Sequence, residues 1–281
     1  MCGEAMPKLP DRLDLLNATV PLRGLAVARG LPYGAHPRQA MDLYRPEGGG
    51  DGLPVLVWFY GGAWQTGRRQ DYRFVAAALA RRGMIVAVPD YRLFPEVRFP
   101  DFLRDAAAAV AEVQQRAAEW GGDGRRVVLA GHSAGAYIAA MLAVDRRWLG
   151  ARRGIAGAVG LAGPYDFLPI IGADIRAIFA TATDPRQTQP AHLADGTAPP
   201  LLLLHGARDD TCWPRNSLAL AARLRAAGGQ AETVLYPRIG HIGIVLGFVP
   251  WLARCPTLAH VERFVSRSLS AAGTRAIQPA A

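Results

Sequence analysis

A serine with the surroundings of a nucleophile stands at position 133, within the sequence Gly131-His132-Ser133-Ala134-Gly135. The apolar segment 127–130 precedes it, and the helix-forming segment 136–140 follows. A strand that turns sharply into a helix exposes the serine oxygen at a sheet edge, and glycines leave room for the turn. The N–H groups at the start of the helix face the same point. This pattern predicts that Ser133 is a nucleophile, whereas His132 packs within the turn.

A serine nucleophile needs a base that takes its proton and an acid that orients the base. After a turn of this type, hydrolases place the acid and then the histidine in loops that follow strands. The apolar segment 201–204 leads to Asp209 and Asp210, and the segment ending at Tyr236 leads to His241. His241 is the predicted base, and the residues themselves leave either aspartate as the acid. The histidines that fit this order less well are His36, His192, His205 and His260.

Two consecutive glycines, Gly61 and Gly62, directly follow the apolar segment 53–60. Acyl transfer generates an oxyanion, which preorganised backbone N–H groups stabilise, and glycines let the substrate carbonyl approach the backbone. We therefore expect the oxyanion hole to consist of Gly61, Gly62 and Ala134, the residue after the nucleophile. The apolar side chains expected to line the pocket, or the core of a lid above it, are Trp64, Phe167, Ile170, Ile171 and Phe179. Of these, Trp64 and Phe167 are expected to bind substrate.

The elements that must position these residues alternate between strands and helices. Strands are expected at 53–60, 84–88, 126–130, 155–161, 200–204 and 232–236. Helices are expected at 71–82, 101–120, 134–144, 214–227 and 257–269. This alternation predicts an α/β fold with a mostly parallel sheet covered by helices on both faces. We expect a single domain over residues 1–281, with 163–199 as a small lid or cap and 273–281 as a disordered tail.

Further motifs between Leu53 and His260 resemble those of α/β-hydrolase esterases, specifically the hormone-sensitive-lipase and kynurenine-formamidase-like carboxylesterases. The stretches that carry the resemblance are Tyr60-Gly-Gly-Ala-Trp64 (family HGGxW), Asp90-Tyr-Arg-Leu93, Gly163-Pro-Tyr-Asp166 and His205-Gly-Ala-Arg-Asp209 (family HGxxD). The resemblance implies the α/β-hydrolase fold, and it implies that Asp209 rather than Asp210 completes a triad with Ser133 and His241. One departure is Tyr60, which stands where the family has a histidine that supports the loop. We expect the Tyr60 hydroxyl to serve the same purpose.

Composition excludes several other classes of protein. The 32 Lys and Arg residues outnumber the 23 Asp and Glu residues, but the arginines form scattered pairs rather than a nucleic-acid-binding module. No apolar stretch approaches the roughly 18 to 20 residues that span a bilayer, and residues 1–10 do not resemble a signal peptide. The three cysteines, Cys2, Cys212 and Cys255, lack metal-ligand spacing and are expected to be reduced. We therefore expect a cytoplasmic protein without nucleic-acid or membrane partners, metal or cofactor.

The function that these residues predict is a serine carboxylesterase. It would hydrolyse small, short-acyl esters through an acyl-enzyme intermediate, with a small-molecule ester as its expected partner; the residues do not indicate an oligomeric state. The alternatives are an arylformamidase-like amide hydrolase or a thioesterase, which would use the same residues. A ligand-binding protein without activity is a further alternative, although such proteins usually lack a member of the triad.

Overall fold

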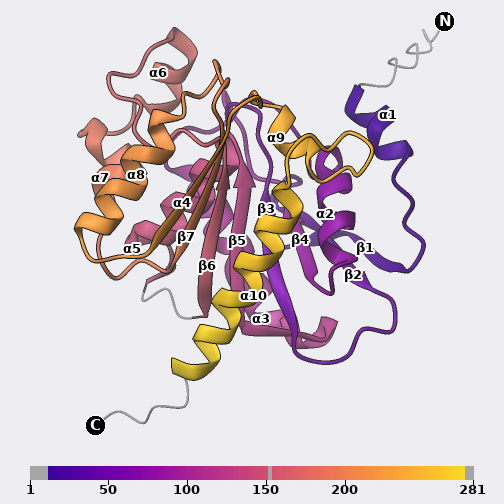
Figure 1. Cartoon of the computed structure of the whole chain (residues 1–281). Coiled ribbons are helices and arrows are strands. Elements are labelled where there is room, and N and C mark those ends of the chain that lie inside the picture. The colour runs from indigo at the N-terminus through magenta and orange to yellow at the C-terminus, as the bar shows by residue number, and fades with distance from the viewer. Residues whose placement is uncertain (1–11, 151–153, 276–281) are drawn as a thin grey trace, which may run out of the picture.

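The computed structural model, which describes residues 12–150 and 154–275, is built around one sheet (Figure 1). Eight strands in this part of the chain pair in the order β1-β2-β4-β3-β5-β6-β7-β8. They are β1 (Leu25–Pro32), β2 (Ala40–Pro46), β3 (Leu53–Phe59), β4 (Ile85–Pro89), β5 (Gly122–His132), β6 (Ile155–Leu161), β7 (Leu201–Gly206) and β8 (Ala231–Tyr236). β2 pairs antiparallel with β1 and with β4, and all other neighbours are parallel. The predicted α/β-hydrolase fold is confirmed.

Helices cover both faces of the sheet. They are α1 (Arg12–Ala18), α2 (Arg73–Ala80), α3 (Asp101–Arg116), α4 (Ala134–Val144), α5 (Arg146–Leu149), α6 (Ala173–Phe179), α7 (Pro190–Leu193), α8 (Arg215–Ala226), α9 (Gly243–Leu246) and α10 (Thr257–Arg275). Three short 3-10 helices are η1 (Arg69–Tyr72), η2 (Ala117–Trp120) and η3 (Pro185–Thr188). In Figure 1, α2 and α10 lie on the near face, and α3 and α4 lie on the far face.

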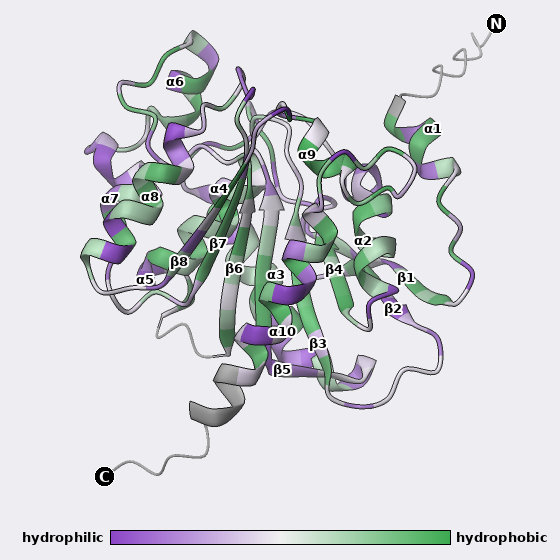
Figure 2. Ribbon diagram, viewed as in Figure 1, coloured by the Kyte–Doolittle hydropathy of each residue, from purple (hydrophilic) through white to green (hydrophobic). Residues whose placement is uncertain are grey.

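The core is formed by the central strands and α4. All five residues of β4 are buried, as are the last five of β3 and the last six of β5. Strands covered on both faces need apolar side chains at every position, which explains their continuous apolar sequence (Figure 2). Every residue of α4 is buried as well, so this helix is apolar on all sides. The core thus fixes β5 and α4, the two elements that flank Ser133.

Three elements near the N-terminus were not predicted from the sequence: α1, β1 and β2. β1 is an edge strand, and only Leu25 of its eight residues is buried. A half-exposed edge strand lacks the apolar pattern by which buried strands are recognised. The predicted tail began too early, because α10 continues through Gly273 to Arg275. One glycine near a helix end lowers the stability of the helix by only about 1 kcal/mol, so the helix can continue through it. The rest of the predicted tail, residues 276–281, lies outside the described residues.

The segment 163–199, predicted to be a lid or cap, contains α6, η3 and α7. Figure 1 shows α6 beyond the carboxyl ends of the strands. The segment packs on the body of the fold: Phe179 lies against Tyr137 of α4, with ring centroids 5.7 Å apart. Tyr137 Oη also donates a hydrogen bond to Thr188 O (2.8 Å). These contacts hold the segment against the helix that follows Ser133.

Candidate active site

Ser133 occupies the turn between β5 and α4. Its backbone is in the left-handed region (φ 55°, ψ −121°), a conformation that costs a non-glycine residue about 1–3 kcal/mol. The adjacent glycines are required by close packing of the backbone. A Cβ on Gly135 would lie 2.1 Å from Phe59 O, and one on Gly131 would lie 2.4 Å from Gly135 C. The turn therefore has the predicted form, and it lifts the Ser133 hydroxyl beyond the end of β5.

The structure brings Ser133, His241 and Asp209 together. The distance between Ser133 Oγ and His241 Nε2 is 2.9 Å, and His241 Nδ1 lies 2.8 Å from Asp209 Oδ2. Asp209 lies in the loop after β7, and His241 lies in the loop after β8. Parallel strands end at the same edge of a sheet, so the two loops meet above β5. In this arrangement His241 can take the proton of Ser133 while Asp209 holds its ring.

Of the two aspartates left open by the residues alone, Asp209 faces the histidine. It is 4% exposed, and its Oδ1 accepts hydrogen bonds from the N–H groups of Thr211 (3.0 Å) and Cys212 (2.8 Å). Burial raises the pKa of Asp209, but hydrogen bonds from His205, His241 and the Cys212 N–H outweigh it and hold the pKa well below its usual range. Asp209 is therefore ionised at neutral pH.

Asp210 is exposed, by contrast, and its carboxylate lies 3.5 Å from Thr211 Oγ1. It does not contact His241. The side chain that follows Asp209 in the sequence thus points away from the histidine.

The structure contradicts the prediction that Gly61 contributes to the oxyanion hole. Its N–H already donates to Tyr72 Oη (3.3 Å), and the residue is buried. The N–H groups of Gly62, Ala63 and Ala134 donate no hydrogen bond to any acceptor in the described part of the chain. Ala63 and Ala134 line the pocket beside Ser133. The candidate donors in this loop are therefore Gly62 and Ala63, one residue further along than predicted, together with Ala134.

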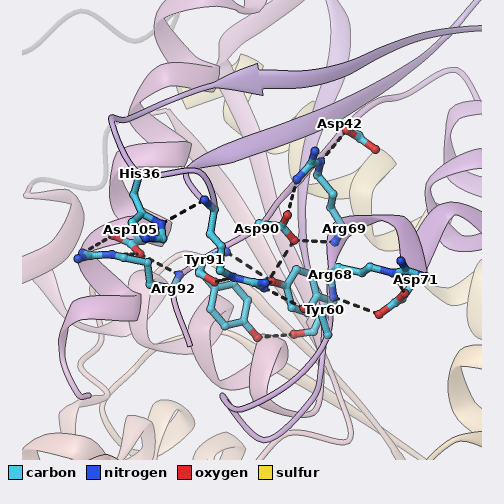
Figure 3. Close-up of polar contacts among 12 residues, drawn as sticks. His36, Asp42, Tyr60, Arg68, Arg69, Asp71, Asp90, Tyr91, Arg92 and Asp105 are labelled. Atoms are coloured by element: carbon cyan, nitrogen blue, oxygen red, sulfur yellow. Dashed lines mark hydrogen bonds and ion pairs between the residues drawn. The ribbon is translucent and has the colours of Figure 1, made fainter. Parts of the chain in front are cut away.

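Tyr60 supports this loop through both its hydroxyl and its carbonyl group. The side chain is fully buried, and its hydroxyl accepts a hydrogen bond from Arg38 (2.7 Å). Tyr91 Oη donates to Tyr60 O (2.9 Å), and the two rings stack at 4.7 Å (Figure 3). Arg38 also donates to Gly67 O (2.8 Å) at the far end of the loop. Arg38 thus connects the tyrosine that replaces the family histidine to Gly67 on the other side of the loop.

A buried ion-pair cluster lies behind the same loop (Figure 3). Arg69 pairs with Asp42 (2.7 Å) and with Asp90, and its backbone N–H donates to Asp90 Oδ1 (2.7 Å). Both aspartates are buried. Removing one member of such a cluster leaves an uncompensated buried charge, which costs several kcal/mol. The cluster therefore fixes η1, which carries Tyr72.

His132, predicted to be a packing residue, is also a polar link between three parts of the site. Its Nε2 lies 3.0 Å from the carbonyl oxygen of His241, and its Nδ1 lies 2.8 Å from Tyr72 Oη. Because a carbonyl only accepts, Nε2 carries the proton and Nδ1 accepts from Tyr72. Burial lowers the pKa of His132 to about 3, so the ring is neutral. With the bond from Gly61, this chain connects the glycine loop, the nucleophile turn and the His241 loop. No sequence signal pointed to Tyr72.

A pocket of about 300 Å³ opens beside Ser133. Both residues predicted to bind substrate, Trp64 and Phe167, line it. Trp64 also packs edge-on against Phe179 (5.0 Å between centroids), which belongs to the core. The other lining residues are Ala63, Ala134, Pro164, Pro169, Ile171, Ile175, Thr211, Cys212, Trp213, Arg215 and Asn216. The sequence did not predict the contribution of Thr211, Cys212, Trp213, Arg215 and Asn216. These residues lie in a loop and in the first turn of α8, and their types do not indicate which cavity they line.

Other features of the described residues bear on cofactors and membranes. Within 12–150 and 154–275, no group of three or more His, Cys, Asp or Glu side chains could hold a metal ion. No helix in these ranges is both long and apolar enough to cross a bilayer. Cys212 and Cys255 are buried and unpaired, and Cys2 lies outside the described residues.

Comparison with known proteins places the chain in a family. The family described as BD-FAE matches residues 41–224. A probable isoprenylcysteine alpha-carbonyl methylesterase of Arabidopsis thaliana is 30% identical over 248 residues, covering 78% of this chain and 52% of that protein. The kynurenine formamidase of Salmo salar is 31% identical over 159 residues, covering 56% of this chain and 53% of that protein. The chain thus spans about half the length of these relatives.

A solved structure gives the same result for the fold. Esterase 2 of Thermogutta terrifontis, in its apo form, superposes with a TM-score of 0.72 at 25% identity. The match covers 88% of this chain and 96% of that structure. The predicted resemblance to α/β-hydrolase esterases and kynurenine formamidases is confirmed. Because the family match extends over more than half of the residues, the chain belongs to the BD-FAE family and is an α/β-hydrolase related to esterases.

Proposed function

We propose that the chain is a serine carboxylesterase that hydrolyses small, short-acyl esters through an acyl-enzyme intermediate. The observation that carries the proposal is the hydrogen-bonded series Ser133–His241–Asp209, which opens onto a pocket beside unpaired backbone N–H groups. The esterases among its relatives support the reaction class.

In the proposed mechanism, His241 Nε2 takes the proton from Ser133 as its Oγ attacks the ester carbonyl carbon. The carbonyl oxygen becomes an oxyanion and accepts hydrogen bonds from the N–H groups of Gly62, Ala63 and Ala134. As the C–O bond breaks, the alcohol leaves with the proton held by His241. Water, deprotonated by His241, then attacks the acyl-enzyme, and the acid is released when Ser133 recovers its proton. Asp209 keeps the proton of neutral His241 on Nδ1 and stabilises the imidazolium.

The size of the pocket supports a preference for short acyl groups. A volume of about 300 Å³ lies at the lower end of the range for ligand pockets, roughly 300–1,000 Å³. Each methylene buried in an apolar pocket contributes about 0.8 kcal/mol until the space is filled. We therefore expect kcat/KM to rise from acetate, and to fall steeply beyond about eight acyl carbons, because a longer chain no longer fits the filled pocket.

The test compares the protein with its Ser133→Ala variant on the p-nitrophenyl esters of acetate, butyrate, octanoate and palmitate. Ser133→Ala should lower kcat by a factor on the order of 10³ or more without unfolding the protein. Ser266→Ala, on the exposed side of α10, is the matched control and should retain full activity. A Ser133→Ala variant with wild-type rates would exclude Ser133 as the nucleophile, and a maximum at palmitate would exclude the short-acyl preference.

A second candidate is hydrolysis of an N-formyl amide, which the similarity to kynurenine formamidase supports. The same groups would act, with His241 protonating the departing nitrogen. N-formylkynurenine and a short-chain acyl thioester, assayed beside the p-nitrophenyl esters, distinguish the three reactions by their kcat/KM values. A protein that binds these compounds and hydrolyses none of them would be a ligand-binding member of the fold.

A further inference from the structure

Arg215 is the only charged side chain among the described residues that line the pocket. It begins α8, and its guanidinium carbon lies 4.4 Å from the centre of the Trp213 ring, which also lines the pocket. A guanidinium stacked on an aromatic face keeps its N–H edge free for hydrogen bonds. The pocket is otherwise mostly apolar, so this cation dominates its electrostatics.

The positive charge of Arg215 is not neutralised within the described part of the chain, where it forms no ion pair or hydrogen bond. The carboxylates in the segments beside the start of α8 have other contacts: Asp166 lies 3.1 Å from His192, Asp209 lies 2.8 Å from His241, and Asp210 lies 3.5 Å from Thr211 Oγ1. The amide of Asn216, the next residue, is also occupied, since its Oδ1 accepts from two backbone N–H groups and its Nδ2 donates to a carbonyl. Arg215 is therefore the charged group of this wall that is available to a ligand.

We propose that Arg215 binds a carboxylate on the substrate, so that the preferred substrates are small esters or formamides carrying a free carboxylate group. This rests on the proposed function of Ser133. A guanidinium pairs with a carboxylate through two parallel N–H···O bonds, while stacking on Trp213 limits the entropy lost on binding. The apolar wall would hold the hydrocarbon between the ester and the carboxylate.

The interaction lies away from the reacting bond, so its effect falls on binding. It has the same strength in the ground state and the transition state, and therefore changes KM rather than kcat. At a partly exposed site, a charge-assisted pair contributes about tenfold in affinity. Because the side chain is exposed, added salt should weaken the effect.

The test uses two pairs of substrates that differ only in a terminal methyl or carboxylate. Mono-p-nitrophenyl glutarate is compared with p-nitrophenyl valerate for the acyl side, and 4-acetoxybenzoate with 4-methylphenyl acetate for the leaving-group side. Arg215→Gln should raise KM about tenfold for the anionic member of at least one pair and leave the neutral member within twofold. Arg215→Lys keeps the positive charge but cannot donate the two parallel N–H···O bonds, so its KM for the anionic ester should lie between those of the wild-type protein and Arg215→Gln.

Arg223→Gln is the control for charge, since Arg223 is an exposed arginine on the same helix that does not line the pocket. It should leave both pairs unchanged. If Arg215→Gln behaves like Arg223→Gln on both anionic esters while the neutral esters are hydrolysed, the carboxylate site is refuted and the esterase proposal stands. If the wild-type protein hydrolyses none of the four esters, the proposed function itself is refuted.

Discussion

Replacing Asp209 with asparagine should abolish most of the activity, whereas the same change at Asp210 should not. Asp209 uses both oxygens: Oδ1 accepts from the N–H groups of Thr211 and Cys212, and Oδ2 accepts from His241 Nδ1. Asparagine has one carbonyl oxygen. If that oxygen keeps the two backbone bonds, the NH₂ group faces His241 and donates to Nδ1. The proton of the imidazole then moves to Nε2, which can no longer accept from Ser133.

The expected size of the effect follows from this tautomer change. An asparagine in the position of a triad aspartate lowers kcat by about 10⁴, as the wrong tautomer and the loss of charge act together. At 1.36 kcal/mol per factor of ten, this corresponds to about 5 kcal/mol of transition-state stabilisation. Asp210→Asn removes an exposed carboxylate that does not contact His241, so kcat should stay within about twofold.

The assay is kcat for p-nitrophenyl acetate at pH 8, with thermal unfolding of each variant as the control for folding. Asp209→Asn should remain folded, because asparagine has the same shape and can keep the two backbone hydrogen bonds. A greater loss in Asp210→Asn would assign the role to Asp210 and refute the reasoning. Equal and severe losses would also refute it, because they would require a network shared by both carboxylates.

Two further predictions concern the hydrogen-bond chain through His132. Tyr72→Phe leaves the Gly61 N–H and His132 Nδ1 without partners, so we expect kcat to fall about tenfold with little change in KM; unchanged kinetics would rule out a positioning role. Burial lowers the pKa of His132 from 6.5 to about 3, so below pH 6.5 the unfolded chain binds a proton that the folded protein excludes. The free energy of unfolding should therefore drop by about 2 kcal/mol between pH 8 and pH 5 through this residue. Urea denaturation at both pH values should give a smaller drop for His132→Gln, and equal drops would contradict the assignment.

The nucleophile turn could be predicted from the sequence because its determinants are adjacent along the chain. An apolar strand, two glycines and a helix-forming segment specify the turn locally, and Gly131 and Gly135 are glycines because backbone atoms leave no space for a Cβ. The central strands were likewise predictable, since burial on both faces requires apolar side chains throughout. The order of strands and loops then predicted His241, because parallel strands bring their carboxyl ends to one edge.

Other features were decided only by the tertiary structure. The sequence offered Gly61 as an oxyanion donor, but Tyr72, from a different element, takes up its N–H. From the residues alone, Asp209 and Asp210 were equivalent; the backbone of their loop turns one carboxylate inward and the other into solvent. The place of Arg215 on the pocket wall also depends on how α8 packs beside the segment 163–199. Periodicity and turn chemistry act between neighbours in the chain, whereas a hydrogen-bond partner or a pocket wall is chosen by packing between elements that the sequence does not place relative to one another.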